Sequence, residues 1–257
     1  LYFFYFDNMS LFNEKLKKIT LKELLSLIIV LFLISYSFNL LNIVHIDSSW
    51  IYFFVIIYFM FKLRNEFFTI KSDIIEIFSN DMLKSILAIV VLNIFFSYGM
   101  LYLSNSILDV SQSINLTNSF LTGGLLATII ISPISEELIF RGVFLNRLRL
   151  IVPTLFAVLI SSLLFAALHS FGSIFSAFIF AICIAILYLK TDNIFVPILA
   201  HFLNNLLAEL IVLIDVNKII FNDSIVVMGM SILAIVSFVL ILRFIVKELN
   251  TIKDNNF

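Results

Sequence analysis

The chain has 257 residues, of which 62% are hydrophobic and only 13% are charged, with a formal net charge of -1. Soluble globular domains are about half apolar and a quarter charged, so this composition predicts an integral membrane protein. The sequence has no basic patch that would suit nucleic acid, no glycine-rich phosphate loop and no Cys/His metal cluster. Its single cysteine, Cys183, excludes an internal disulfide.

Long apolar segments follow one another along the whole chain. A hydrocarbon core of about 30 Å needs roughly 20 apolar residues per helix. By this measure the sequence predicts an all-α membrane protein, a bundle of eight transmembrane helices forming a single polytopic domain over residues 1–257. The predicted spans are 22–44, 48–63, 84–107, 120–146, 153–171, 173–189, 194–214 and 224–243.

The positive charges predict the orientation of these spans. With eight spans, one set of alternating loops holds 14 of the 16 Lys and Arg residues, and the opposite set holds only Lys218. The remaining one, Arg141, lies inside a span. Because loops rich in Lys and Arg stay in the cytoplasm, both termini are predicted to be cytoplasmic.

The segments outside the spans have their own patterns. Residues 1–21 form a predicted N-terminal cytoplasmic segment, within which Met9 is a candidate initiator, so residues 1–8 are treated as non-native and left out of the fold prediction. Segments 10–20 and 65–82 mix apolar with charged side chains. That pattern fits amphipathic helices lying on the cytoplasmic membrane surface, and it fits ordinary loops equally well.

Three of the predicted spans carry ionisable or strongly polar side chains in or near their interiors. A charge at the bilayer centre costs about 3 kcal/mol, so such residues usually mark a functional site. They are Glu136, Glu137 and Arg141 in span 120–146, His169 near the end of span 153–171, and His201 with Asn205 in span 194–214.

The two neighbouring glutamates have different surroundings on a helix. Glu137 and Arg141 are four residues apart and share a face, which predicts an ion pair along the helix. Glu136 points about 100° away, so it must face a polar cavity or another helix, where it could activate water as a general base. The alternative is a buried ion-pair network that only locks helices together.

The other two spans each repeat a four-residue spacing. Phe165 and His169 share one face, and so do His201 and Asn205. Imidazole and carboxamide groups on one face can donate hydrogen bonds to a developing oxyanion, or they can join neighbouring helices. Glu209 continues the face of His201 and Asn205 by one more turn, and no role is assigned to it.

Taken together and in this order, the three motifs Glu-Glu-x-x-x-Arg, Phe-x-x-x-His and His-x-x-x-Asn resemble those of the CAAX-protease and bacteriocin-processing family, also called the Abi family. The resemblance covers residues 120–210, which would form the catalytic core. It implies an intramembrane endopeptidase of glutamate type or metallo-type.

The resemblance also implies roles for the matched residues. Glu136, assisted by His169, would activate a water, and His201 and Asn205 would stabilise the oxyanion. Glu137, Arg141 and Phe165 would support them. We expect no metal cofactor; the alternative is zinc, held by Glu136, His169 and His201.

Depth along the helices tests this assignment. At about 1.5 Å per residue, Glu136 lies roughly 15–20 Å from the end of its helix at Arg149, and Asn205 lies at a similar depth in its own span. A straight helix over 153–171 puts His169 nearer the outer end, so that helix must be tilted or must start late.

The expected partners are membrane lipid and a peptide or protein substrate at the membrane, in a multi-pass protein of a bacterial plasma membrane. Candidate substrates are precursors of peptide pheromones or bacteriocins, or incoming bacteriocins in a self-immunity role. The competing functions are a non-catalytic membrane scaffold or regulator and an ion-coupled transporter. The substrate and the oligomeric state are left open.

Overall fold

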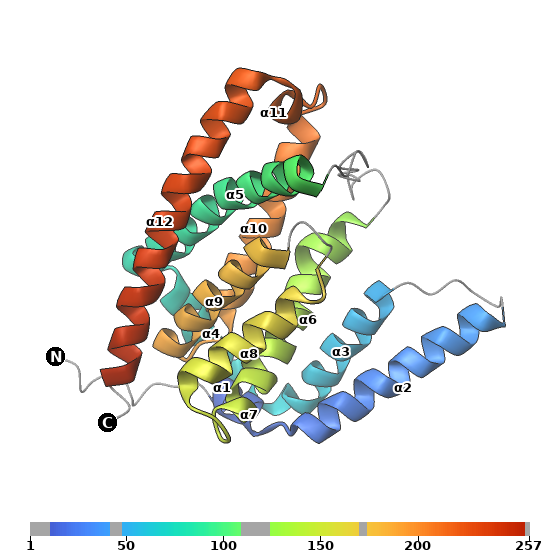
Figure 1. Ribbon diagram of the computed structural model, residues 1–257. Helices are drawn as coiled ribbons and strands as arrows, with labels where there is room; N and C mark the ends of the chain where they lie inside the picture. Colours follow the sequence, from blue (N-terminus) through green and yellow to red (C-terminus); the bar gives the residue numbers. More distant parts are fainter. Residues whose placement is uncertain (1–10, 42–47, 109–123, 170–173, 255–257) are drawn as a thin grey trace.

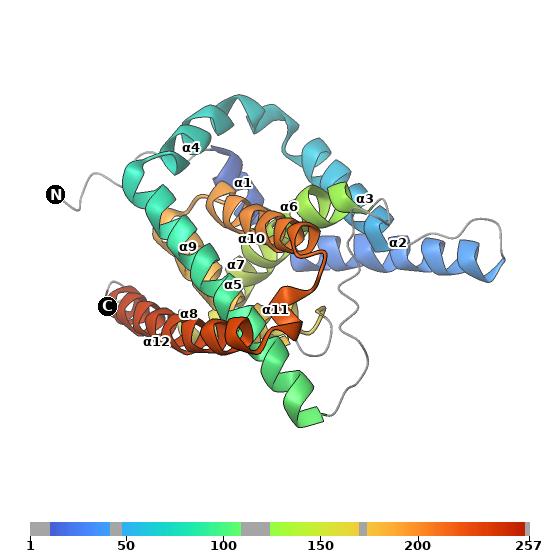
Figure 2. The ribbon, with the colours of Figure 1, turned by 90° about the horizontal axis from the view of Figure 1, so that it is seen from above.

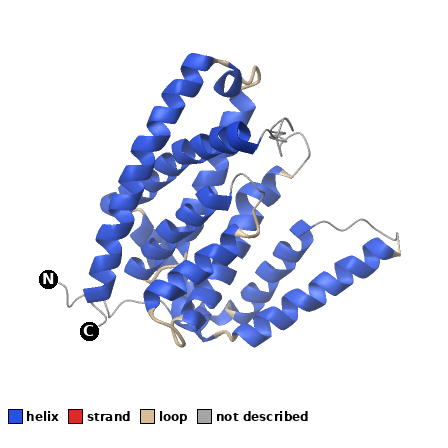
Figure 3. Cartoon of the chain, in the orientation of Figure 1, coloured by secondary structure: helices blue, strands red, loops and turns tan. Residues whose placement is uncertain are grey.

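A computed structural model describes residues 11–41, 48–108, 124–169 and 174–254, and this part of the chain contains helices and no strand (Figures 1 and 3). The all-α prediction is therefore confirmed for the described residues. The elements are α1 (Leu11–Lys18), α2 (Leu21–Leu40), α3 (Ser48–Lys62), η1 (Arg64–Thr69), α4 (Ile70–Ile77), α5 (Asn80–Leu108), η2 (Ala127–Ile131), α6 (Ser132–Glu137), η3 (Leu138–Leu145), α7 (Asn146–Leu148), α8 (Thr154–Ala166), α9 (Ile174–Thr191), α10 (Phe195–Ile214), α11 (Ile219–Asn222) and α12 (Ser224–Asp254).

Each of the eight predicted ranges contains helix, and the protein is a multi-pass membrane protein. Within the described residues, five helices are long and apolar enough to cross a membrane, namely α2, α5, α9, α10 and α12, and the apolar helices α3 and α8 are shorter. The count of eight spans thus stays a prediction. The ends of several ranges and the prediction about residues 1–8 lie outside the described residues.

Contacts join the segments that the charge pattern assigns to one side. Lys62 at the end of α3 binds Glu23 at the start of α2 at 2.5 Å, and Lys190 of α9 binds Glu248 of α12 at 2.9 Å. At the other end of α12, Tyr102 of α5 donates a hydrogen bond to a carbonyl of α11 at 2.8 Å. This arrangement agrees with helices that alternate in direction, and the side that faces the cytoplasm stays a prediction.

The predicted amphipathic segments form helices, and α1 is packed inside the protein. The side chain of Leu16 is fully buried. Asn13 donates a hydrogen bond to Asp73 of α4 at 2.8 Å and accepts one from the backbone N–H of Ile194 at 3.0 Å. The apolar face of α1 is therefore covered by protein, whereas Phe78, directly after α4, keeps an exposed aromatic ring.

The helices differ greatly in how much protein surrounds them. Helix α9 lies in the middle of the bundle with most of its side chains buried, and α2 extends away from the body with a single buried residue, Leu24 (Figures 1 and 2). Helices α5 and α12 pack along each other. At Gly99 of α5 the two backbones come so close that an added Cβ would lie 2.3 Å from the Cβ of Ala234. Small residues allow such close packing where the surrounding lipid gives little hydrophobic drive.

We expect Gly99→Ala to destabilise the protein by about 1–3 kcal/mol, because the new methyl group must push α5 and α12 apart. Thermal unfolding in detergent measures this change. The matched control is Gly229→Ala on α12, where an added Cβ meets nothing within 4 Å. Ala234→Gly should restore part of the stability in the Gly99→Ala protein, and equal effects of the two glycine substitutions would contradict the packing described here.

Candidate active site

The two glutamates lie on a helical stretch that runs without a break from Ala127 to Leu148. Its middle, α6, is α-helical, and the flanking segments η2 and η3 are π-helical. Pro133 in the first turn of α6 has no N–H to donate, so the regular hydrogen-bond pattern is already interrupted there. Single π-turns inside α-helices are frequent at functional sites.

Glu137 is the centre of a buried network of charges. Its Oε1 accepts a hydrogen bond from Arg141 at 3.0 Å, which confirms the predicted pair along the helix. The same oxygen lies 2.8 Å from Nδ1 of His201 on α10. The side chains of Glu137 and Arg141 are almost fully buried. One carboxylate thus holds a guanidinium on its own helix and an imidazole on another.

Arg141 extends this network to two further helices. Its second terminal nitrogen donates a hydrogen bond to the carbonyl of Ala181 on α9 at 3.1 Å. Its guanidinium carbon lies 4.5 Å from the ring centroid of Phe165 on α8, a cation–π distance. The ring of Phe165 also contacts the imidazoles of His169 and His201, at centroid distances of 4.8 and 5.5 Å. Phe165 therefore sets the spacing between the arginine and both histidines.

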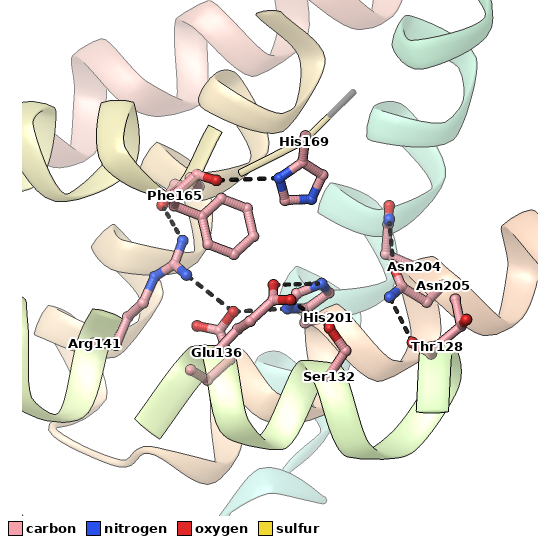
Figure 4. A network of polar contacts seen from close by, with 11 residues as sticks. Thr128, Ser132, Glu136, Arg141, Phe165, His169, His201, Asn204 and Asn205 are labelled. Atoms are coloured by element: carbon pink, nitrogen blue, oxygen red, sulfur yellow. Dashed lines mark hydrogen bonds and ion pairs between the residues drawn. The ribbon is translucent and has the colours of Figure 1, made fainter. Parts of the chain in front are cut away.

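Glu136 faces away from this ion pair, as the helical geometry predicts. Its Oε1 accepts a hydrogen bond from the hydroxyl of Ser132, one turn earlier on the helix. Its Oε2 is buried without a hydrogen-bond partner in the described part of the chain and lies 4.0 Å from Nε2 of His201. The carboxylate is thus fixed through one oxygen, and the other is directed toward the imidazole (Figure 4).

His169 lies in the turn that follows α8, three residues after the last helical position. Its Nδ1 lies 3.1 Å from the carbonyl of Phe165, so in the neutral ring Nδ1 carries the proton and Nε2 is left as an acceptor. Helix α8 has only 13 residues and begins at Thr154. This short helix brings His169 to the other polar groups, which a straight helix over 153–171 would not do.

Asn205 lies one turn beyond His201 on α10. Its side-chain nitrogen donates a hydrogen bond to the carbonyl of Thr128 in η2 at 2.9 Å, and its oxygen lies 3.4 Å from the amide of Asn204. Asn204 in turn accepts a hydrogen bond from Asn93 of α5 at 2.9 Å. Asn204 and Asn93 thus join helices, while Asn205 borders the space in front of Glu136.

A cavity of about 450 Å³ connects the residues that the three motifs single out. Polar and apolar side chains from several helices line it. The lining residues are Tyr52, Ala127, Thr128, Ser132, Glu136, Leu168, His169, His201, Asn205, Ala208 and Glu209. The structure therefore brings Glu136, His169, His201 and Asn205 to one space, and it places Glu137, Arg141 and Phe165 directly beside it.

The zinc alternative finds no match in this geometry. Among the described residues, which include Glu136, His169 and His201, no group of three or more His, Cys, Asp or Glu side chains is spaced to hold a metal ion. A zinc site needs its protein ligands within about 2.0–2.2 Å of one point. Glu136, His169 and His201 therefore do not fit a zinc ion in this arrangement.

Several cavity residues were not predicted from the sequence. Ser132 is one turn before Glu136, so the spacing could have indicated it, although a serine in an apolar helix is a weak signal. The contact between Glu137 and His201 joins two motifs and needs the tertiary structure. Tyr52 lies on α3, which none of the three motifs includes.

Comparisons with known proteins agree with the motifs. Residues 117–207, about a third of the chain, match a family model described as Type II CAAX prenyl endopeptidase Rce1-like. Neither the curated proteins nor the solved structures contain a significant match to the chain. The matched segment contains all three motifs and most of the cavity lining. By its motifs and by this match, the segment 117–207 is similar to the type II CAAX prenyl endopeptidases.

Proposed function

We propose that the protein is an intramembrane endopeptidase that hydrolyses a peptide bond with a water activated by Glu136. One observation carries this proposal: Oε2 of Glu136, which has no hydrogen-bond partner among the described residues, lies 4.0 Å from an imidazole nitrogen of His201, at a cavity that also holds His169 and Asn205. That separation is too long for a direct hydrogen bond and suits a group bound between the two.

In this mechanism Glu136 takes a proton from the water while the water oxygen attacks the scissile carbonyl carbon. Ser132 holds Oε1, so Oε2 is the oxygen that acts as base. His169 presents the acceptor Nε2 to the same water and orients it. The proton then passes to the amide nitrogen, the carbon–nitrogen bond breaks, and no covalent intermediate with the enzyme forms.

The negative charge that develops on the carbonyl oxygen needs donors in fixed positions. Asn205 offers an amide hydrogen, because only one of its two is shown bound, to Thr128. Glu137 holds the proton on Nδ1 of His201, so Nε2 donates only when the ring carries both protons. The carboxylates of Glu136 and Glu137 flank that ring, at 4.0 Å from Nε2 and 2.8 Å from Nδ1.

Three further residues position the catalytic side chains without contacting the substrate, namely Glu137, Arg141 and Phe165. Glu137 orients His201, as a carboxylate orients the histidine in other hydrolases. Arg141 neutralises Glu137, and its contact with Phe165 fixes the helix that leads to His169.

The proposed substrate is a membrane-associated peptide or protein. Candidates are precursors of peptide pheromones or bacteriocins, and incoming bacteriocins in a self-immunity role. The proposed location is a bacterial plasma membrane.

Glu136→Gln should lower kcat by about 10²–10⁴-fold, because the amide keeps the shape of the carboxylate and cannot take up the proton. The assay uses quenched fluorescent peptides that the wild-type protein cleaves in lipid nanodiscs. Glu76→Gln is the matched control, since Glu76 is exposed on α4 away from the cavity lining. Full activity of the Glu136→Gln protein would exclude Glu136 as the base and overturn the proposed mechanism, whereas a wild-type protein that cleaves no peptide would favour a scaffold or a transporter.

Asn205→Ala should lower kcat by about 10²–10³-fold with a smaller effect on KM, because the lost donor acts mainly on the charge of the transition state. Asn222→Ala, at the exposed end of α11, serves as the control. A rise in KM at unchanged kcat would instead assign Asn205 to substrate binding.

We expect activity to persist after exhaustive chelation followed by buffer exchange, since in the proposed reaction Glu136 activates the water without a metal. Metal content measured by mass spectrometry verifies that the protein is metal-free. Loss of activity that added Zn²⁺ restores would overturn this mechanism and would assign Glu136, His169 and His201 to metal binding.

A further inference from the structure

Glu209 is a carboxylate on α10 that the proposed mechanism does not use. It lies in a helix apolar enough to cross a membrane, where an ionisable group is rare unless it has a function. It lines the same cavity as Glu136, and its Oε2 is buried without a hydrogen-bond partner in the described part of the chain. A buried acceptor without a hydrogen-bond partner costs free energy, so a ligand that donates a hydrogen bond to it gains binding free energy.

The charge of the cavity indicates the kind of group that Glu209 would bind. Two carboxylates, Glu136 and Glu209, are among the described residues that line it, and no Lys or Arg is. Arg141 is not a lining residue; its charge is engaged by Glu137. The wall of the cavity therefore carries surplus negative charge, which favours a cation over an anion or a neutral group.

We propose that Glu209 is a specificity residue that binds a basic side chain of the peptide substrate. This inference rests on the proposed peptidase function and adds the class of substrate to it. The charge balance favours a lysine or arginine at the position of the peptide that faces Glu209, and it disfavours an acidic residue there.

The spacing along α10 predicts where the basic residue lies. Glu209 is four residues beyond Asn205 and eight beyond His201, which corresponds to about 6 Å and about 12 Å along the helix axis. An extended peptide advances about 3.3 Å per residue. If the carbonyl under attack lies between His201 and Asn205, the basic side chain belongs about two to three residues from the scissile bond.

The first test compares cleavage of peptides that differ at one position. Lysine, its neutral analogue norleucine and glutamate are placed in turn at each of the three positions on either side of the scissile bond. At one position the wild-type protein should prefer lysine to norleucine by about tenfold or more in kcat/KM, the factor expected for one hydrogen bond between charged groups. In Glu209→Gln this ratio should fall to near one, and Glu209→Lys should prefer glutamate, whereas Glu76→Gln should keep the wild-type ratio.

The second test measures binding without turnover. In the Glu136→Gln protein the other cavity carboxylate is neutral, so a preference for the lysine peptide over the norleucine peptide, read by fluorescence anisotropy, belongs to Glu209. We expect about tenfold tighter binding of the lysine peptide, and equal binding of both peptides by the Glu136→Gln, Glu209→Gln double variant.

The two tests separate this inference from the proposed function. A lysine preference that is absent in both tests, or that survives Glu209→Gln, overturns the role of Glu209 even when the wild-type protein cleaves peptides. A lysine preference in binding that depends on Glu209, in a protein that cleaves none of the peptides, supports the role of Glu209 and counts against hydrolysis.

Discussion

The carboxylate of Glu137 is the contact on which the arrangement of the site depends. One of its oxygens binds Arg141 on the same helix and His201 on α10, and its side chain has no exposed surface. A charge buried in an apolar bundle is tolerated only when it is paired and hydrogen-bonded. The pairing with Arg141 therefore compensates the buried charge of Glu137. The contact with His201 fixes the position of α10 relative to Glu137 and Arg141.

Two adjacent glutamates serve different purposes because a helix separates them by about 100°. Glu137 points into protein, where its charge is compensated. Glu136 points to the cavity, where one oxygen is anchored by Ser132 and the other is unpaired among the described residues. One glutamate thus pairs with protein groups while its neighbour faces the cavity, and we expect removal of the two to have different effects.

Much of this could be predicted from the sequence, since charge inside an apolar helix is conspicuous and a four-residue spacing fixes a shared face. The helices, the pair of Glu137 with Arg141 and the convergence of the three motifs follow from these rules. The position of His169 does not, because apolar periodicity cannot show that α8 stops at Ala166 and that a turn carries the imidazole inward. The position of Tyr52 at the cavity could not be predicted either, because it depends on how α3 packs against a segment distant in sequence.

The π-helical segments on either side of α6 have a consequence for how this region tolerates change. A π-turn holds one more residue than an α-turn, and it leaves carbonyls that other groups must bind. The side-chain amide of Asn146 binds the carbonyls of Arg141 and Gly142, and the hydroxyl of Ser161 binds that of Phe140. A π-turn that loses its extra residue closes to an ordinary α-turn, and the residues on either side keep their faces. A deletion within η2 or η3 would therefore change the bonds to these carbonyls more than the direction of the helix.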